Sequence, residues 1–385
     1  MENILPMKIT LKRTPEQVEL VKAMASRNKA VAYEAQVALA EFIGPVLAEV
    51  LNQAPTVSNL FQSLQFNADD NPSIPLDLYY NISDEDYVQV YSQSHAGGLP
   101  TNQVLPTASE LKLATYSLDT AVSFDRRYAA KSRMDVVSKT FTRVAQEILL
   151  KQETTSATLL MTAVASATTN GKAHVQTNNV ANKFTLSDMN DLLTLAKRIN
   201  TSWVGGTPTT RTRGLTDLIV SPEIVQDIRS MAYNAINSKD ADNSAPGGTD
   251  GLAAPDELRM DIFRNAGIPE FYGLGIMEIN ELGINQKFND LFDTAAGSTT
   301  YYNADGASIG MQFDTSTDDF VLGVDRSKDA LIRAVAVDAE SGSEFNLIAD
   351  DQYSIRQNKI GYFGSIDEGR VVLDNRVLVG KIVGP

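Results

Sequence analysis

Cysteine is absent from the 385 residues, and histidine occurs only twice. The absence of cysteine excludes disulfide bonds, thiolate zinc sites and a cysteine nucleophile. With two histidines, a mechanism that needs several imidazole groups is excluded as well. No apolar run approaches the roughly 18 residues of a membrane-spanning helix, and the first residues lack the apolar core of a secretory signal. We therefore expect a chain that is made and folded in the cytoplasm, with no membrane partner.

Basic residues are scarce relative to acidic ones. The chain has 33 lysines and arginines against 48 aspartates and glutamates, which gives a net charge of -15. A general nucleic-acid coat needs a basic face that replaces phosphate counterions, so this class is excluded. Binding to an anionic membrane through bulk charge is excluded for the same reason. Hydrophobic residues make up 43% and charged residues 21%, which is typical of an ordinary globular protein.

Charge is also unevenly distributed along the chain. Residues 30–111 contain no lysine or arginine, whereas residues 112–151 contain eight basic and four acidic residues. Opposite charges from these two stretches could pair within one subunit or between neighbouring subunits. The alternative is that both stretches carry solvated charge, since a surface ion pair contributes only about 0–1 kcal/mol to stability. The candidate contacts between subunits are Asp84, Glu85, Asp86, Arg126, Arg127 and Lys131.

The first predicted element is a long helix. Thr14 can cap it, Pro15 fits its first position, and Gln17 completes a capping box. Apolar residues then recur at helical spacing up to Gly44–Pro45, which should break or kink the helix before a short last piece over residues 46–51. An ordinary core helix and an arm lying on a neighbouring surface both fit this stripe.

A long β excursion is predicted next. Strict alternation of apolar and polar residues from Ile74 to Ser83 predicts a strand, and Gly97–Pro100 is typical of a tip. The apolar positions of the returning stretch change parity near Thr115, which indicates a bulge. We interpret residues 66–124 as a two-stranded excursion, which needs outside support because an isolated hairpin is marginal in water.

The remaining chain alternates helices with strands. Helical spacing predicts a second long helix over residues 134–167 and a third from Thr185. Residues 218–220 read as a buried strand, and Ser221-Pro222-Glu223 then opens a helix to about residue 237. Residues 238–319 are acidic and are predicted to be solvated loops. The predicted C-terminal strands are 320–324, 331–337, 353–362, 371–373 and 377–383.

No complete catalytic, cofactor or metal motif is present. Residues 306–310 match the G-x-S-x-G nucleophile elbow, but no histidine follows His174 to complete a triad in the required order. The stretch 240–251 fails as a calcium loop, because Ala245 and Gly251 stand where glycine and glutamate are required. We interpret His95 and His174 as plain surface histidines. The sequence therefore predicts no enzyme, no cofactor and no metal.

Two consecutive runs carry a family resemblance: SIPLDLYYNISDEDYVQVYSQSHAGGLPTNQVLPTASELKLATYSLDTAVSFDRRY and MDVVSKTFTRVAQEILLKQETTSATLLMTAVASA. With the later runs LTDLIVSPEIVQDIRSM and NKIGYFGSIDEGRVVLDNRVLVGKI, the chain resembles a tailed-bacteriophage major capsid protein with the Hong Kong 97-type fold. The resemblance covers residues 56–385 and rests on the order and pattern of elements, not on an invariant motif.

The resemblance implies an α+β fold with an N-terminal arm helix, an extended β-hairpin E-loop, a P-domain with a long spine helix, and an A-domain. The implied segments are 1–65 for the N-terminal arm, 66–124 for the E-loop, 125–213 for the P-domain with its spine helix, 214–342 for the A-domain, and 343–385 for C-terminal strands that recross the P-domain and return to the A-domain.

The implied function is structural. Subunits of this family form hexamers and pentamers that close into an icosahedral shell around double-stranded DNA, which is packaged without specific binding. Portal, scaffolding or decoration proteins are the implied partners, and the implied location is the virion capsid, assembled in the host cytoplasm. Some members join subunits through an E-loop lysine. Because no lysine precedes Lys112 in the E-loop segment, we expect no covalent cross-linking here.

Three alternatives remain open. An encapsulin-like nanocompartment shell shares the fold, but its subunits usually lack a long acidic insertion such as 238–319. A filament or surface-layer protein such as flagellin fits the abundant alanine, threonine and asparagine, but the β-rich end VVLDNRVLVGKIV counts against it. A soluble enzyme would need a catalytic set that the motifs do not supply.

Overall fold

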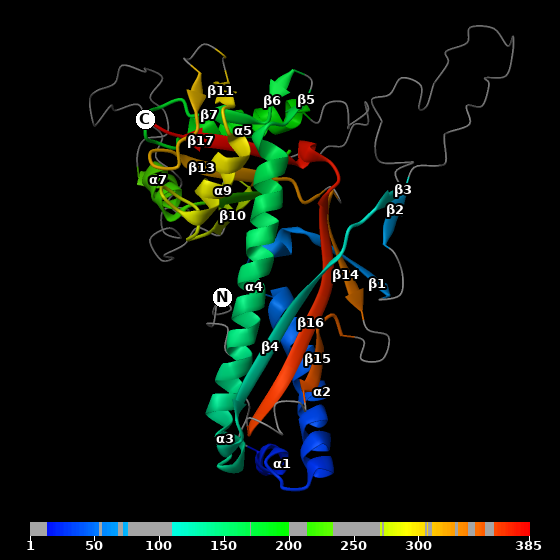
Figure 1. Ribbon diagram of the computed structural model, residues 1–385. Coiled ribbons are helices and arrows are strands. Elements are labelled where there is room, and N and C mark those ends of the chain that lie inside the picture. The colour runs from blue at the N-terminus through cyan, green and yellow to red at the C-terminus, as the bar shows by residue number, and fades with distance from the viewer. Residues whose placement is uncertain are drawn as a thin grey trace, which may run out of the picture. The chain divides into compact units, whose positions relative to one another are not determined.

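The structure is a computed structural model, shown as a ribbon in Figure 1. It describes residues 14–53, 56–67, 72–75, 110–169, 171–199, 214–233, 270–271, 273–304, 306, 310–327, 330–337, 343–350 and 358–385. The chain divides into two compact units, each assembled from distant stretches of sequence. Unit 1 comprises residues 1–74, 111–156 and 332–371, and unit 2 comprises residues 75–110, 157–331 and 372–385. These contact-defined units do not test the predicted domain boundaries, which stay a prediction.

The N-terminal helix of unit 1 is interrupted earlier than the sequence analysis predicted. The structure has α1 (Pro15–Met24) and α2 (Lys29–Gln53), with Pro45 inside α2. Of the predicted break or kink at Gly44–Pro45, the break is therefore wrong, because α2 continues through Pro45. The chain turns instead at residues 25–28, where the Asn28 side chain accepts a hydrogen bond from the Ala30 amide at 3.2 Å and starts α2 as a cap. Pro45 lies on the exposed face of α2.

Five strands form the sheet of unit 1, in the order β1 (Gln62–Asn67), β14 (Leu331–Val337), β16 (Lys359–Val372) and β15 (Asn346–Asp350), with β4 (Tyr116–Asp125) also paired to β16. β1 runs parallel to β14, whereas β4 and β15 run antiparallel to β16. β4 and β16 lie side by side over ten residue pairs (Figure 1). β15 was not predicted.

The structure describes only the two ends of the predicted excursion 66–124. β2 (Ser73–Pro75) pairs with β3 (Glu110–Lys112), whereas the ends of the predicted excursion belong to β1 and β4 in the sheet of unit 1. The parity change near Thr115 falls in the break between β3 and β4. There the chain passes so close to β16 that a Cβ on Gly369 would lie 2.5 Å from the Ala114 carbonyl oxygen, so only glycine fits.

The core of unit 1 lies between this sheet and its helices. The long helix α4 (Met134–Ala165) confirms the helix predicted over 134–167, and the short α3 (Arg126–Ala130) precedes it. The rings of Phe141 and Tyr362 meet edge to face with centroids 5.3 Å apart. Apolar residues of α2 pack into the same core, so the predicted first helix is a core helix of its own unit. They include Leu39, Ile43, Leu47 and Leu51.

Unit 2 is built on a six-stranded sheet in the order β7 (Val175–Thr177), β17 (Leu378–Val383), β13 (Asp319–Val324), β8 (Asp217–Val220), β10 (Leu274–Glu278) and β9 (Glu270–Phe271). Every residue of β13 and β17 is buried, as expected for strands covered on both faces. The unit also contains α5 (Leu186–Ile199), α7 (Pro222–Tyr233), α9 (Lys287–Ala296), η2 (Asn375–Val377) and the strand pairs β5 (Thr168–Thr169) with β6 (Lys172–Ala173) and β11 (Thr300–Tyr301) with β12 (Met311–Gln312).

The prediction that residues 238–319 form only loops is wrong where the structure describes them. β10 extends the sheet beside β8, and α9 contributes Phe292, whose ring stacks on Phe320 with centroids 3.9 Å apart. The acidic residues masked the apolar spacing of Phe288, Phe292 and Ala296, which are buried. Residues 238–269 lie outside the described part of the chain.

Among the described residues, α2 is the one helix long and apolar enough to cross a membrane. Its window Lys29–Asn52 has a mean hydropathy of 1.3, and 44% of the window is buried. Length and composition alone cannot separate a membrane span from a core helix. Because one face of α2 packs into the core of unit 1, tertiary packing accounts for its apolar composition.

Phe141→Ala should lower the free energy of unfolding by about 3–5 kcal/mol, because it removes a fully buried ring and leaves a cavity against Tyr362. Urea unfolding followed by circular dichroism measures this loss. The matched truncation Tyr128→Ala, at a ring that is 45% exposed on α3, should change stability by no more than about 0.5 kcal/mol. Equal losses in the two variants would contradict this view of the core.

Candidate functional site

The six candidate contact residues fall into three groups in the structure. Asp84, Glu85 and Asp86 lie outside the described residues. Arg126 is half-buried, and its guanidinium donates to the carbonyl oxygens of Ala25, at 3.1 Å, and of Ser26. Arg126 therefore fastens α3 to the turn between α1 and α2 within unit 1.

Arg127 and Lys131 are exposed at the two ends of α3. The Arg127 side chain is 79% exposed and lies 3.4 Å from Asp125, a surface pair of little energetic weight. Lys131 is the C-terminal cap residue of α3. Both side chains are accessible to a neighbouring subunit, and their role as contacts stays a prediction.

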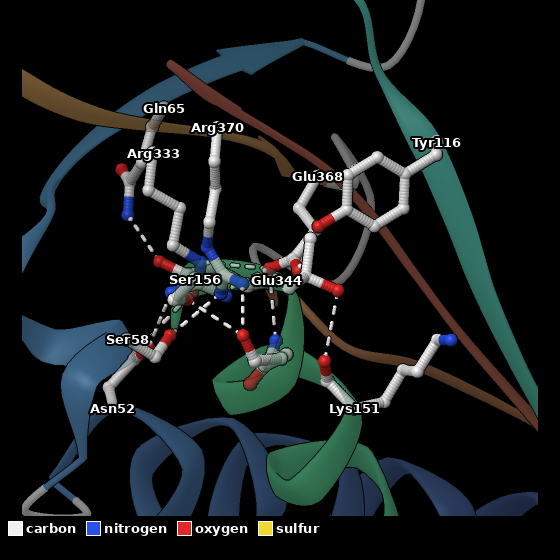
Figure 2. A network of polar contacts seen from close by, with 12 residues as sticks. Asn52, Ser58, Gln65, Tyr116, Lys151, Ser156, Arg333, Glu344, Glu368 and Arg370 are labelled. Carbon is white, nitrogen blue, oxygen red and sulfur yellow. Dashed lines mark hydrogen bonds and ion pairs between the residues drawn. The ribbon is translucent and has the colours of Figure 1, made fainter. Parts of the chain in front are cut away.

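The most elaborate polar arrangement in unit 1 is a buried cluster around Glu368, which the sequence analysis did not identify (Figure 2). One carboxylate oxygen, Oε2, accepts from Arg333 Nε at 2.9 Å, Gln152 Nε2 at 3.0 Å and Arg370 Nη2 at 3.1 Å. The other, Oε1, accepts from the Tyr116 hydroxyl at 3.0 Å. Glu368 is fully buried, and its charge is therefore balanced by donors rather than by water.

The two arginines extend the cluster in different directions. Arg370 donates to the Gln152 carbonyl oxygen and to Ser58 Oγ, both at 2.7 Å, and its guanidinium lies 5.9 Å from the centre of the Phe61 ring. Ser58 belongs to η1 (Val57–Leu60). Arg370 thereby joins β16 to η1 and to α4.

Arg333 connects Glu368 to a second carboxylate, that of Glu344. Arg333 Nη1 lies 3.8 Å from Glu344 Oε2 and donates to Asn52 Oδ1 at 3.1 Å. Asn52 and Gln65 each donate to Glu344 at 3.1 Å, so the end of α2 and strand β1 are tied to the same group. Two arginines and two glutamates leave the cluster balanced in charge.

The electrostatics of the cluster follow from its burial. Burial, together with the negative charge of Glu368, raises the pKa of Tyr116 to about 12, so the phenol remains a hydrogen-bond donor at neutral pH. Burial also lowers the pKa of Arg370, against the opposing effect of Glu368. Removing these charges from water costs much of the free energy that their mutual attraction provides, so the intact cluster contributes little net stability. Removing one member costs much more, because it leaves a buried charge without a partner.

The geometry of the cluster suits a structural clamp and not a reactive site. Glu368 accepts four hydrogen bonds and is shielded from solvent, so neither oxygen is accessible to a substrate. A signal was present in the sequence. Glu368 and Arg370 share the even parity of Ile360, Tyr362 and Ile366, which face the core along β16.

Unit 2 contains a comparable buried charge. Lys381 of β17 is completely buried, and its ammonium lies 3.2 Å from Asp188 and 3.2 Å from Asp191. Asp188 also accepts from the amides of Thr185 and Asn179 at 2.8 Å each. Helix α5 and the last strand are therefore held together by an ion pair that the apolar run around Lys381 concealed.

The interpretation of His174 as a surface residue is wrong. Its side chain is fully buried, with Nδ1 3.0 Å from the Leu378 carbonyl oxygen and Nε2 2.9 Å from the Thr169 hydroxyl. The carbonyl requires a proton on Nδ1, so Nε2 accepts from Thr169 in the neutral ring. Burial lowers the pKa of His174 below its usual 6.5. His95 lies outside the described residues.

No ligand site emerges from the remaining polar groups of the residues that the structure describes. Among the residues that the structure describes, no group of three or more histidines and carboxylates could hold a metal ion. A surface hollow of about 440 Å³ in unit 2 is lined by Asp374 and Arg376, but these two charges pair with each other at 2.6 Å. Residues 307–309 and 240–251, from the two rejected motifs, lie outside the described part.

Glu368→Gln should destabilise the protein by about 3–5 kcal/mol, because it leaves two buried arginines without their shared carboxylate. Denaturant unfolding measures the loss. Asp367→Asn is the matched control, since Asp367 precedes Glu368 on β16 but is exposed. A Glu368→Gln variant no less stable than the control would show that the cluster is not a clamp.

Stability should fall as the pH drops below 6.5, in part through His174. The unfolded state takes up a proton near the usual pKa of 6.5, whereas the folded state resists it, so this contribution is present above pH 6.5 and is lost below. Between about pH 7.5 and 5.5 the unmodified chain should lose more stability than His174→Gln, which has no imidazole to protonate. Parallel pH profiles in thermal unfolding would refute the assignment.

The chain has similar proteins among solved structures only. No protein-family model and no curated protein matches the chain. Among solved structures, it is similar to the capsid of cyanophage P-SCSP1u, with 11% identity, 84% of this chain and 86% of that chain covered, and a TM-score of 0.47.

Two further solved structures are similar to the chain at comparably low sequence identity. The capsid of an empty GTA particle shows 11% identity, 86% and 91% coverage and a TM-score of 0.46. An encapsulin complex from Synechococcus elongatus shows 10% identity, 84% and 85% coverage and a TM-score of 0.44. Phage capsids thus recur among the similar structures, as they did in the resemblance of the sequence. All three TM-scores are below 0.5, so these similarities carry no functional argument.

Proposed function

We propose that this chain is a structural subunit of a closed protein shell, namely the major capsid protein of a tailed bacteriophage. The order of elements around α4 carries the proposal. The paired strands β2 and β3 stand at the two ends of residues 76–109, and β4, α3 and the long α4 follow directly. This is the order of E-loop and spine helix that the sequence resemblance implies.

The internal chemistry of both units supports a passive role. The strongest polar arrangements, around Glu368 and Lys381, are buried and use their charges to hold elements together. Buried ion pairs of this kind help a shell subunit to keep its conformation in an assembly. An enzyme, in contrast, needs reactive groups in an accessible pocket.

The charge of the chain supports a container for nucleic acid. With a net charge of -15, the subunit repels phosphate on average. Double-stranded DNA can then be packed inside without being retained by the wall. Hexamers and pentamers of the same chain would form the shell, with portal, scaffolding or decoration proteins as partners in the virion, and host cytoplasm as the place of assembly.

The purified recombinant chain should assemble into closed shells, rings of five or six, or tubes, visible by negative-stain electron microscopy. Because the E-loop segment has no lysine before Lys112, the particles should migrate as single chains in denaturing electrophoresis. A stable, compact monomer at high concentration would contradict the proposal.

The same preparation separates the phage capsid from the alternative encapsulin-like shell. Terminase and portal genes beside its gene support the capsid, whereas a neighbouring cargo enzyme that co-purifies inside the particles supports the nanocompartment. A ladder of linked chains on the denaturing gel would refute the expected absence of cross-links without touching the shell itself.

A further inference from the structure

Helix α2 carries large apolar side chains on the face that points away from its own core. Phe42 is 53% exposed and Val31 is 41% exposed. Ala38 and Pro45 are exposed as well, and the four positions follow one another at spacings of seven, four and three residues. Such spacing places them on one line along the helix. We call these four residues the α2 ridge.

Acidic residues accompany this ridge on one side. Glu34 and Glu41 are exposed and lie seven residues apart, and neither forms an ion pair with another residue of the described part of the chain. Residues 30–111 supply no basic side chain to neutralise them. An apolar line bordered by unpaired charge of one sign is typical of the partner side of an interface.

Helix α4 carries an exposed apolar residue and charges of both signs on its outward face, with Glu147 exposed between Arg143 and Leu150. Leu150 is 48% exposed, and Arg143 and Lys139 precede it by seven and eleven residues on the same line. Both basic residues are exposed, and in the described part of the chain neither has an ion-pair partner. We call these three residues the α4 ridge.

The two ridges match in spacing, and Arg143 is opposite in charge to Glu34. At about 1.5 Å per residue, Glu34 precedes Phe42 by about 12 Å and Arg143 precedes Leu150 by about 10.5 Å. Two helices that run parallel can therefore place Phe42 against Leu150 and Glu34 beside Arg143 at the same time. The Phe42–Leu150 contact would then be bordered by the Glu34–Arg143 ion pair.

The two ridges of one copy cannot meet each other. α2 and α4 bury their opposite faces in the same core of unit 1, so their outward faces point away from that shared core. A contact between the α2 ridge and the α4 ridge must therefore join two copies. Such a head-to-tail contact uses different surfaces on the two partners, and it closes into a ring when the rotation fits.

We propose that the α2 ridge of one copy docks on the α4 ridge of the next copy, with Phe42 against Leu150 and Glu34 beside Arg143. This inference rests on the proposed function and gives the shell subunit a specific lateral contact. A lipid surface is a weaker occupant for the α2 ridge, because Glu34 and Glu41 would lie at the level of the apolar side chains.

The absence of cysteine permits a direct test by disulfide trapping. Copies that carry Phe42→Cys and copies that carry Leu150→Cys are co-assembled, oxidised and separated by non-reducing denaturing electrophoresis. The mixture should give disulfide-linked dimers, whereas either variant alone should give none. A chain with both substitutions should give a ladder of linked chains.

Two further pairs keep the test decisive. Glu34→Cys with Arg143→Cys probes the same contact without removing an apolar side chain, and should also cross-link. Phe42→Cys with Ala121→Cys is the control, since Ala121 is exposed on β4 and belongs to neither ridge. Dimers in a single variant, or equal dimers in the control, would overturn the head-to-tail contact.

The experiments distinguish failure of the contact between the α2 ridge and the α4 ridge from failure of the proposed shell function. Shells that form but do not cross-link through either ridge pair overturn this inference and leave the proposed function intact. Failure of the unmodified chain to assemble overturns both. Flotation of the unmodified chain with phosphatidylcholine vesicles, abolished by Phe42→Ser, would assign the α2 ridge to lipid and overturn the contact between copies.

Discussion

A single buried carboxylate constrains most of unit 1. Glu368 has no access to water, so its charge must be matched by donors that the chain supplies from elsewhere. Those donors come from β4, α4, β14 and β16, and Arg370 and Arg333 relay the connection to η1 and the end of α2. Because every link is a directional hydrogen bond, the elements are fixed in position as well as in contact.

Both units depend on the last part of the chain. Residues 332–371 provide three of the five strands of the first sheet, and residues 372–385 provide β17, whose Lys381 holds α5. Neither sheet can be completed before the C-terminal residues are available. This discontinuity couples the folding of distant segments, since strands β1 and β4 pair with β14 and β16, more than 200 residues later in the chain.

Charged residues are arranged differently on the outer surfaces and in the cores. Inside each unit, opposite charges are brought together and buried. On the outer faces of α2 and α4, Glu34, Glu41, Lys139 and Arg143 lie near exposed apolar side chains and form no ion pair within the described part of the chain. A subunit that satisfies its interior but leaves complementary outer lines unmatched is suited to repeated association. The proposed shell thus requires no chemistry beyond packing and charge.

The sequence by itself determined the elements whose signals are local. Helix α4 and strand β14 were predicted almost to the residue, because apolar periodicity and caps depend on near neighbours. The sequence also determined the exclusion of thiol chemistry and of a basic nucleic-acid face. Only the tertiary structure decided that β4 pairs with β16, that His174 is buried, and that Glu368 lies within reach of Arg333 and Gln152. These contacts join residues that are far apart in the chain. The sequence does not show whether a polar side chain forms its hydrogen bonds with solvent or with a distant residue.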